Sequence, residues 1–133
     1  MSTSDDPVRI QHVTVDCADP YALATFWSRV TGWALDPQDE PGDPEALLHP
    51  SNPALPELLF IRVPDGKSVK NRLHLDLVPR HRTRDEQVEW LLGIGAKVLD
   101  DQRRPDGKGW VVMTDPEGNE FCVERGAAER ASG

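Results

Sequence analysis

The sequence predicts an α+β fold in which two tandem βαβββ modules form a curved mixed sheet around a cavity. Two observations lead to this fold class. First, each half of the 133-residue chain contains an alternating segment, then one amphipathic helix, then three short extended segments. Second, equivalent residues of the two halves recur at a nearly constant offset. Such self-similarity indicates a duplicated structural unit.

The first half starts with IQHVTVD (residues 10–16), whose alternation of apolar and polar residues is typical of a half-buried strand. In DPYALATFWSRVTG (residues 19–32), apolar residues recur at the i, i+3, i+4, i+7 spacing of a helix with one apolar face. Asp19 suits the N-cap of this helix, and Gly32 suits its left-handed C-terminal position. Three extended segments follow, WALDP, EALLH and ELLFIRV.

The second half repeats this arrangement. NRLHLDLVPR (residues 71–80) places three leucines on one face of a strand, which we expect to be the core face, and His74 and Asp76 on the other. TRDEQVEWLLGIG is the second helix. Its Thr83 and Glu86 form a capping-box pattern, and Val88, Leu91 and Leu92 supply its apolar face. The extended segments AKVLD, WVVMT and EFCVE follow, with the turn DPEG between the last two.

The two halves can be aligned residue by residue. Equivalent pairs lie 62 or 63 residues apart: His12 and His74, Trp27 and Trp90, Gly32 and Gly95, and Glu57 and Glu120. We therefore predict a single domain at 8–125 with modules at about 8–63 and 72–125 and flexible tails at 1–7 and 126–133. Because one helix covers only one face of each module, the uncovered faces can enclose a cavity.

Composition excludes several classes of partner. The formal net charge of −8 disfavours binding to a phosphate backbone or an anionic membrane surface. No apolar run is long enough to span a membrane, and MSTSDDP lacks the features of a signal peptide. The basic groups Arg80, Arg82 and Arg84, and Arg103 with Arg104, are interpreted as solvated loop charge. We expect a cytoplasmic protein that binds small organic molecules and other protein chains.

The duplicated plan, with KNRLHLDL (residues 70–77) and DPEGNEFCVE (residues 115–124), resembles the vicinal oxygen chelate superfamily. This superfamily includes glyoxalase I, extradiol dioxygenases, fosfomycin resistance enzymes and bleomycin-binding proteins, and the chain is similar to its glyoxalase-like domains. The resemblance covers residues 8–125 and implies a homodimer, since relatives commonly pair their sheets across subunits. It implies no single reaction, because the scaffold hosts isomerases, dioxygenases, transferases and non-catalytic binders.

The resemblance also implies metal ligands on the first, fifth and eighth strands, usually His, His and Glu. His12 and His74 match the first two positions, whereas the eighth-strand position falls on Cys122. The resemblance places the second Glu of glyoxalase I on the fourth strand. At that position this chain has Leu59, the repeat equivalent of Cys122, so the two-His, two-Glu set of glyoxalase I is absent. Two imidazoles and a thiolate suit zinc or iron, and Glu124, two residues further along, is another candidate ligand. The alternative, which we favour, is that Cys122 is a small buried hydrophobic residue.

Strand alternation adds further candidates to the predicted cavity. Trp110 is either a stacking wall or a core tryptophan, and Arg72 either meets a substrate carboxylate or pairs with Asp76. Asp76 is also suited to orient an imidazole. The predicted ligand pocket consists of His12, Thr14, Leu59, Ile61, Arg72, His74, Asp76, Trp110 and Cys122.

These residues support two functions. The leading hypothesis is a metal-free or weakly metallated small-molecule-binding protein of the resistance or sequestration type. The alternative is a metal-dependent lyase, isomerase or dioxygenase. In it, zinc, iron, nickel or manganese, held by His12, His74 and either Cys122 or Glu124, would chelate two vicinal oxygens of a substrate. A role in protein association alone is disfavoured by histidines that are predicted to lie inside the cavity.

Overall fold

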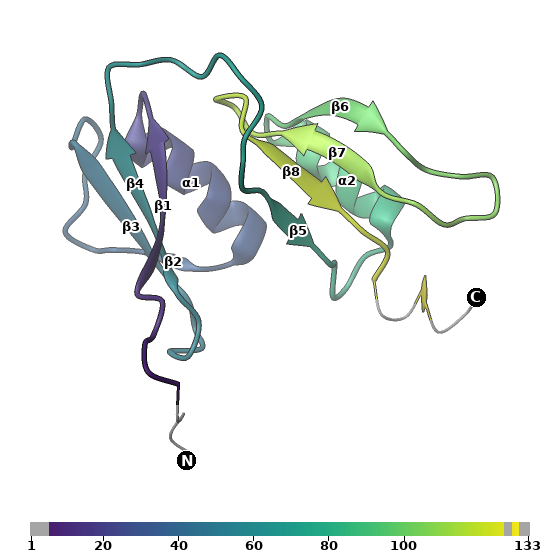
Figure 1. Ribbon diagram of the computed structural model, residues 1–133, viewed down its shortest axis with the longest axis horizontal. Helices are drawn as coiled ribbons and strands as arrows, with labels where there is room; N and C mark the ends of the chain where they lie inside the picture. The colour runs from purple at the N-terminus through teal and green to yellow at the C-terminus, as the bar shows by residue number, and fades with distance from the viewer. Residues whose placement is uncertain (1–5, 127–128, 131–133) are drawn as a thin grey trace. The chain divides into compact units, whose positions relative to one another are not determined.

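The computed structural model describes residues 6–126 and 129–130, so the predicted tails at 1–7 and 126–133 lie largely outside the described residues. The chain divides into two compact units, Met1–Asp65 and Gly66–Gly133. Each unit has the element order βαβββ, which confirms the predicted α+β fold with two tandem modules (Figure 1). Within the described residues, the strands pair into two separate four-stranded mixed sheets instead of one curved sheet.

The first unit places one helix against one face of its sheet (Figure 1). Its elements are β1 (His12–Cys17), α1 (Pro20–Thr31), β2 (Ala34–Leu35), β3 (Glu45–His49) and β4 (Glu57–Arg62). The strand order is β1-β4-β3-β2, in which β1 runs parallel to β4 and the other pairs are antiparallel. Leu48, Leu58 and Phe60 are buried on the face covered by α1, together with the helix residues Leu23 and Trp27. The opposite face stays open within this unit.

The ends of α1 are where the sequence predicts them. The side chain of Asp19 accepts a hydrogen bond from the backbone N–H of Ala22 at 3.2 Å. Gly32 adopts φ +75°, and its N–H donates to the carbonyl oxygen of Ser28. Glycine adopts this left-handed conformation without the strain that a side chain would bring, which makes Gly32 a favourable end for the helix.

The second unit repeats the topology. Its elements are β5 (Leu75–Leu77), α2 (Arg84–Gly93), β6 (Lys97–Asp101), β7 (Val111–Thr114) and β8 (Glu120–Val123). The strand order is β5-β8-β7-β6, with β5 parallel to β8. Val88 and Leu91 of α2 are buried, as are Met113, Phe121 and Val123 of the sheet. Residues next to these in the strands face the other way, so Asp76, Cys122 and Val112 lie side by side on the open face.

The capping box predicted for α2 is present, but three predictions about burial are wrong. Leu73 is 85% exposed, because the strand begins only at Leu75 and the residues before it follow an irregular path. Leu92 is exposed as well, so the apolar face of α2 is narrower than its sequence suggests. Arg84, predicted to be solvated, is only 5% exposed, because the loop between β6 and β7 covers it.

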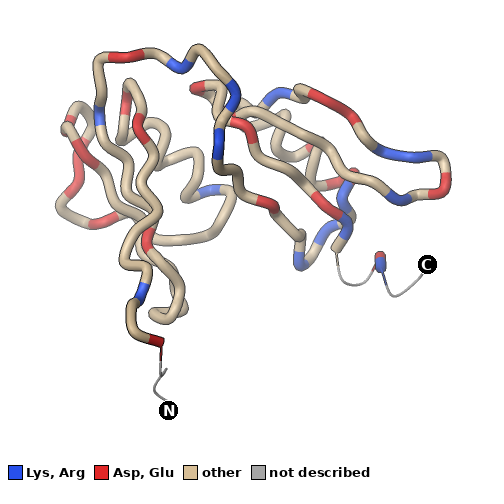
Figure 2. The backbone as a smooth tube through the Cα atoms, in the orientation of Figure 1, with Lys and Arg blue, Asp and Glu red and all other residues tan. Residues whose placement is uncertain are grey.

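Charge is distributed unequally between the units. Residues 1–65 contain 11 acidic and 3 basic side chains, whereas residues 66–133 contain 12 of each. The whole net charge of −8 therefore belongs to the first unit, and the second is neutral (Figure 2). Neither of the two main helices in the described part of the chain has the length and hydrophobicity that crossing a bilayer requires.

Candidate functional site

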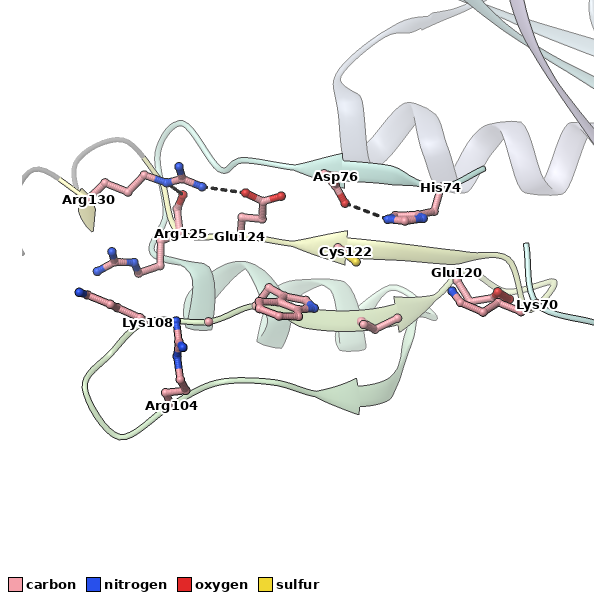
Figure 3. Close-up of a pocket in the computed structure, with 13 residues that line it drawn as sticks. Lys70, His74, Asp76, Arg104, Lys108, Glu120, Cys122, Glu124, Arg125 and Arg130 are labelled. Atoms are coloured by element: carbon pink, nitrogen blue, oxygen red, sulfur yellow. Dashed lines mark hydrogen bonds and ion pairs between the residues drawn. The ribbon is translucent and has the colours of Figure 1, made fainter. Parts of the chain in front are cut away.

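The second unit has a hollow of about 640 Å³ on the open face of its sheet (Figure 3). β5, β8 and β7 form its floor, because Asp76, Cys122 and Val112 stand opposite one another in the strand register and all line it. The hairpin between β6 and β7 forms one wall. Four residues of the predicted pocket line this hollow: His74, Asp76, Trp110 and Cys122.

His74, Asp76 and Cys122 form a cluster of potential metal ligands. One donor atom of each lies within 4.8 Å of the other two, and His74 Nε2 is 3.4 Å from Asp76 Oδ1. An imidazole nitrogen, a carboxylate oxygen and a sulfur are donors that zinc and iron accept, so these residues fit a divalent ion. Glu124, the other predicted ligand, lines the hollow, but its carboxylate is paired with Arg130 at 2.7 Å.

Cys122 is protonated near neutral pH. Burial raises the pKa of its thiol to about 11, and the nearby Asp76 carboxylate acts in the same direction. A bound divalent ion would have to displace this proton, since the thiolate is the form that binds metals. Without an ion, Cys122 is therefore a small, weakly polar part of the floor.

Two of the acidic residues in the hollow already have cationic partners. Glu120 Oε1 lies 2.5 Å from Lys67 Nζ, and Glu120 Oε2 accepts a hydrogen bond from the backbone N–H of Asn71 at 2.7 Å. Burial opposes ionisation of Glu120, but these two hydrogen bonds hold its pKa below the usual value. The second acidic residue with a cationic partner is Glu124, whose carboxylate forms an ion pair with Arg130. Both groups are thus compensated anions.

Trp110 and Arg72 lie in different environments. Trp110 lines the hollow and is 43% exposed, so it is a wall residue and not a core tryptophan. Arg72 is exposed and is not among the residues that line the hollow.

Sequence reasoning missed five cationic lining residues: Lys70, Arg104, Lys108, Arg125 and Arg130. They come from irregular segments at the strand ends, where no periodic pattern predicts the direction of a side chain.

The remaining predicted pocket residues belong to the first unit. His12, Thr14, Leu59 and Ile61 lie on the open face of its sheet, where Thr14 pairs with Leu59. The structure describes this face within its own unit, so a cavity that holds both His12 and His74 stays a prediction.

The open face of the first unit carries a row of alternating histidines and carboxylates. His12 Nε2 lies 3.2 Å from Glu57 Oε1, and His49 Nδ1 lies 2.6 Å from Glu57 Oε2. The other nitrogen of His49, Nε2, is 2.9 Å from Asp36 Oδ2. Sequence reasoning missed His49, although antiparallel pairing of EALLH with ELLFIRV brings it close to Glu57.

The pKa of His49 is predicted to fall when Asp36 is replaced by asparagine. The hydrogen bond from His49 to Asp36 is the largest cause that raises the pKa of His49 above 6.5, and Glu57 adds to it. Since the folded-state pKa is raised, the stability from His49 is complete below pH 6.5 and is lost as pH rises through the raised pKa. An NMR titration of His49 in the wild type and in Asp36→Asn measures this shift.

Asp65→Asn is the matched control, because it removes the same charge from an exposed residue that has no contact with His49. An unchanged His49 titration in Asp36→Asn would contradict the ion pair. An equal shift in both variants would indicate a general charge effect instead.

The family model described as "Glyoxalase-like domain" matches residues 12–124. The chain belongs to this family. It is thereby a member of the glyoxalase, bleomycin resistance and dioxygenase superfamily, also called the vicinal oxygen chelate superfamily, as its sequence predicts. No curated protein gives a significant match.

Three solved structures illustrate the shared fold of this glyoxalase-like protein. The fosfomycin resistance protein FosX of Listeria monocytogenes has a TM-score of 0.66 at 16% identity, covering 91% of this chain and 92% of that one. A glyoxalase/bleomycin resistance protein/dioxygenase family enzyme of Burkholderia phytofirmans PsJN has a TM-score of 0.64 at 16% identity, covering 87% and 97%. A glyoxalase-related enzyme of Fulvimarina pelagi has a TM-score of 0.62 at 20% identity, covering 87% and 86%.

Proposed function

We propose that this glyoxalase-like protein binds a small organic molecule in the second-unit hollow, as a protein of the resistance or sequestration type. The observation that carries this proposal is the exposed Trp110 ring in the wall of a hollow of about 640 Å³. Ligand sites commonly have volumes of ~300–1,000 Å³ and combine apolar or aromatic walls with a few polar anchors. Trp110 and Val112 provide apolar surface, and His74 and Asp76 provide polar anchors.

A relative with the same fold supports this reading. A variant of FosX, a fosfomycin resistance protein, is described in complex with Mn(II) and 1S,2S-dihydroxypropylphosphonic acid, a small organic molecule. Neighbours on this fold thus include both resistance proteins and enzymes, and the local residues must decide between them.

The binding proposal is tested by thermal unfolding of the whole chain with a panel of small organic acids, amides and aromatic compounds. A compound that binds the folded state raises the unfolding temperature. Trp110→Ala should abolish that increase. Leu99→Ala should retain it, because Leu99 is another exposed apolar residue of the same unit and does not line the hollow. Equal stabilisation of both variants would place the binding site elsewhere.

A second candidate is a metal-dependent lyase, isomerase or dioxygenase. The observation that favours it is the cluster of His74, Asp76 and Cys122. When bound there, a divalent ion supplies Lewis-acid stabilisation to vicinal oxygens of a substrate. Of the chain's own groups, His74 and Cys122 would hold the ion, and Asp76 would either bind it or orient His74.

Elemental analysis separates the two candidates. The protein is analysed as purified and after incubation with zinc, iron, nickel or manganese, alongside His74→Ala, Cys122→Ala and His12→Ala. For a binding protein we expect metal well below one equivalent per chain. One equivalent that is lost in His74→Ala and Cys122→Ala would support the enzyme. Loss of the bound metal in His12→Ala as well would mean that ligands from both units share one ion.

We also propose that the protein acts in the cytoplasm as a homodimer and does not bind nucleic acid. Its net charge of −8 supports the last point, because a phosphate backbone would be repelled. Light scattering of the purified chain tests the dimer, and a mass of one chain would contradict it.

A further inference from the structure

One end of the hollow is formed by cations that form no ion pair with the carboxylates lining it. We call Arg104, Lys108 and Arg125 the basic end; Figure 3 shows them grouped on the opposite side of the hollow from Lys70 and Glu120. Among the described residues, none of these three side chains forms an ion pair or donates a hydrogen bond. Cations that are held together repel one another, so an anion placed between them would be stabilised.

None of the carboxylates that line the hollow forms an ion pair with the basic end. Of the three carboxylates that line the hollow, Glu120 is paired with Lys67, Glu124 is paired with Arg130, and Asp76 lies beside His74. Asp106 lies near the basic end but outside the lining, and its Oδ1 accepts a hydrogen bond from the backbone N–H of Lys108 at 2.9 Å.

The cations of the basic end contribute to a lowered pKa at the neighbouring Asp106. The hydrogen bond from Lys108 is the largest cause that lowers the pKa of Asp106, and the charges of Arg104, Lys108 and Arg125 lower it further. The same cations would therefore stabilise the ionised form of an acidic ligand.

The loop that carries Arg104 and Lys108 is anchored to α2. The backbone N–H of Arg104 donates to the carbonyl oxygen of Lys108 at 2.8 Å, which closes the loop on itself. The buried guanidinium of Arg84 donates through Nη1 to the carbonyl oxygens of Gly107, Lys108 and Gly109 at 3.2, 3.1 and 3.0 Å. A loop held in this way loses little conformational entropy when a ligand binds.

Gly109, the residue before Trp110, lies where the loop backbone packs closely against Gln102. Gly109 has φ +97°, and a Cβ at this position would lie 2.1 Å from the carbonyl oxygen of Gln102, so only glycine fits. The next residue, Trp110, lines the same hollow as Arg104 and Lys108. An aromatic face and a group of cations in one hollow match a ligand that has a planar part and an acidic part.

We infer that the hollow binds a planar organic anion, whose acid group contacts the basic end and whose ring packs on Trp110. The ligand class is that of aromatic or conjugated acids with a carboxylate, phosphonate or sulfonate group. This inference rests on the proposed binding function and specifies its ligand. Guanidinium groups bind such oxyanions through paired hydrogen bonds, which gives direction as well as charge. The first unit carries the chain's net negative charge and would repel the same anion.

The test uses benzoate and phenylphosphonate as probes and benzamide as their uncharged counterpart. Binding to the whole chain is followed by the indole N–H signal of Trp110 in two-dimensional NMR spectra, assigned with Trp110→Phe. We expect both acids to shift this signal with dissociation constants that increase with salt, because the attraction is electrostatic. Benzamide should bind at least about ten times more weakly, a difference of ~1.4 kcal/mol.

Variants locate the acid group. Arg104→Gln combined with Lys108→Gln, and Arg125→Gln separately, should each weaken binding of phenylphosphonate at least about tenfold. Arg80→Gln is the matched control, since Arg80 is an exposed arginine of the same unit that does not line the hollow. The unfolding curve of each variant verifies that it is folded.

Two results would overturn the inference. Equal binding of benzamide and the acids, without an effect of the variants, would leave a binding protein with no anion site. Absence of any shift with all three probes at tens of millimolar would exclude aromatic acids. The broader binding function would fall with the inference only if the thermal-unfolding panel also gave no ligand.

Discussion

Replacement of Arg84 by methionine is expected to lower the free energy of unfolding by about 2–4 kcal/mol. The guanidinium of Arg84 is buried at the start of α2 and donates to three carbonyl oxygens of the loop between β6 and β7. Its Nε also donates to Asp85 Oδ1 at 3.0 Å. Methionine has a similar length and apolar stem but no donor, so the variant removes the hydrogen bonds while it retains most of the packing.

Arg84→Lys should give a smaller loss than Arg84→Met. Lysine keeps the positive charge but lacks the planar fork of donors, so it cannot reproduce the same set of hydrogen bonds. Urea unfolding of the whole chain measures the free energies, and Arg80→Met is the control, since Arg80 is exposed and has no partner among the described residues. A loss of less than about 1 kcal/mol in Arg84→Met would contradict this prediction, because it would mean that the hydrogen bonds of the buried guanidinium contribute little to the free energy of unfolding.

The same variant has a functional consequence. If Arg84 holds the loop that presents Arg104, Lys108 and Trp110, Arg84→Met should also weaken ligand binding at temperatures where the chain is still folded. Arg84 does not line the hollow, so its effect is one of positioning. Partial recovery of binding in Arg84→Lys would distinguish this role from a direct contact with ligand.

Replacement of Phe121 by alanine is expected to lower the free energy of unfolding by about 3–5 kcal/mol. Phe121 is 1% exposed and lies in β8, with Leu75 of β5 on one side and Met113 of β7 on the other. Removing its ring loses the burial of a large apolar side chain and leaves a cavity that the three strands cannot close. Because β8 also carries Glu120 and Cys122, the floor of the hollow should lose its order as well.

Leu73→Ala is the matched control for Phe121→Ala. The sequence predicts Leu73 as a core residue, but it is 85% exposed, so its replacement should change the unfolding free energy by less than about 0.5 kcal/mol. Urea unfolding followed by circular dichroism and by the Trp110 indole signal compares both variants. A loss of several kcal/mol in Leu73→Ala would restore the sequence-based placement of this residue in the core.

The sequence by itself determines the elements of this protein and its family. Both ends of α1 follow from Asp19 and Gly32, and the start of α2 follows from the Thr83–Glu86 capping box. The strands follow from the alternation of their residues. Caps, turns and alternation depend on residues within about four positions of one another, so they can be predicted from the sequence. The 63-residue offset extends this local information to a duplicated unit and so to the vicinal oxygen chelate superfamily.

Strand alternation predicted four of the residues that line the hollow, His74, Asp76, Trp110 and Cys122, but only the tertiary structure shows which other side chains join them. Arg84 is buried because residues 107–109, more than 20 positions away, fold back over it, and the basic end exists because that loop and Arg125 line one hollow. His49 joins Asp36 and Glu57 through strand pairing in the same manner. Proximity of this kind depends on the path of distant backbone segments, and no periodic pattern in the sequence encodes it.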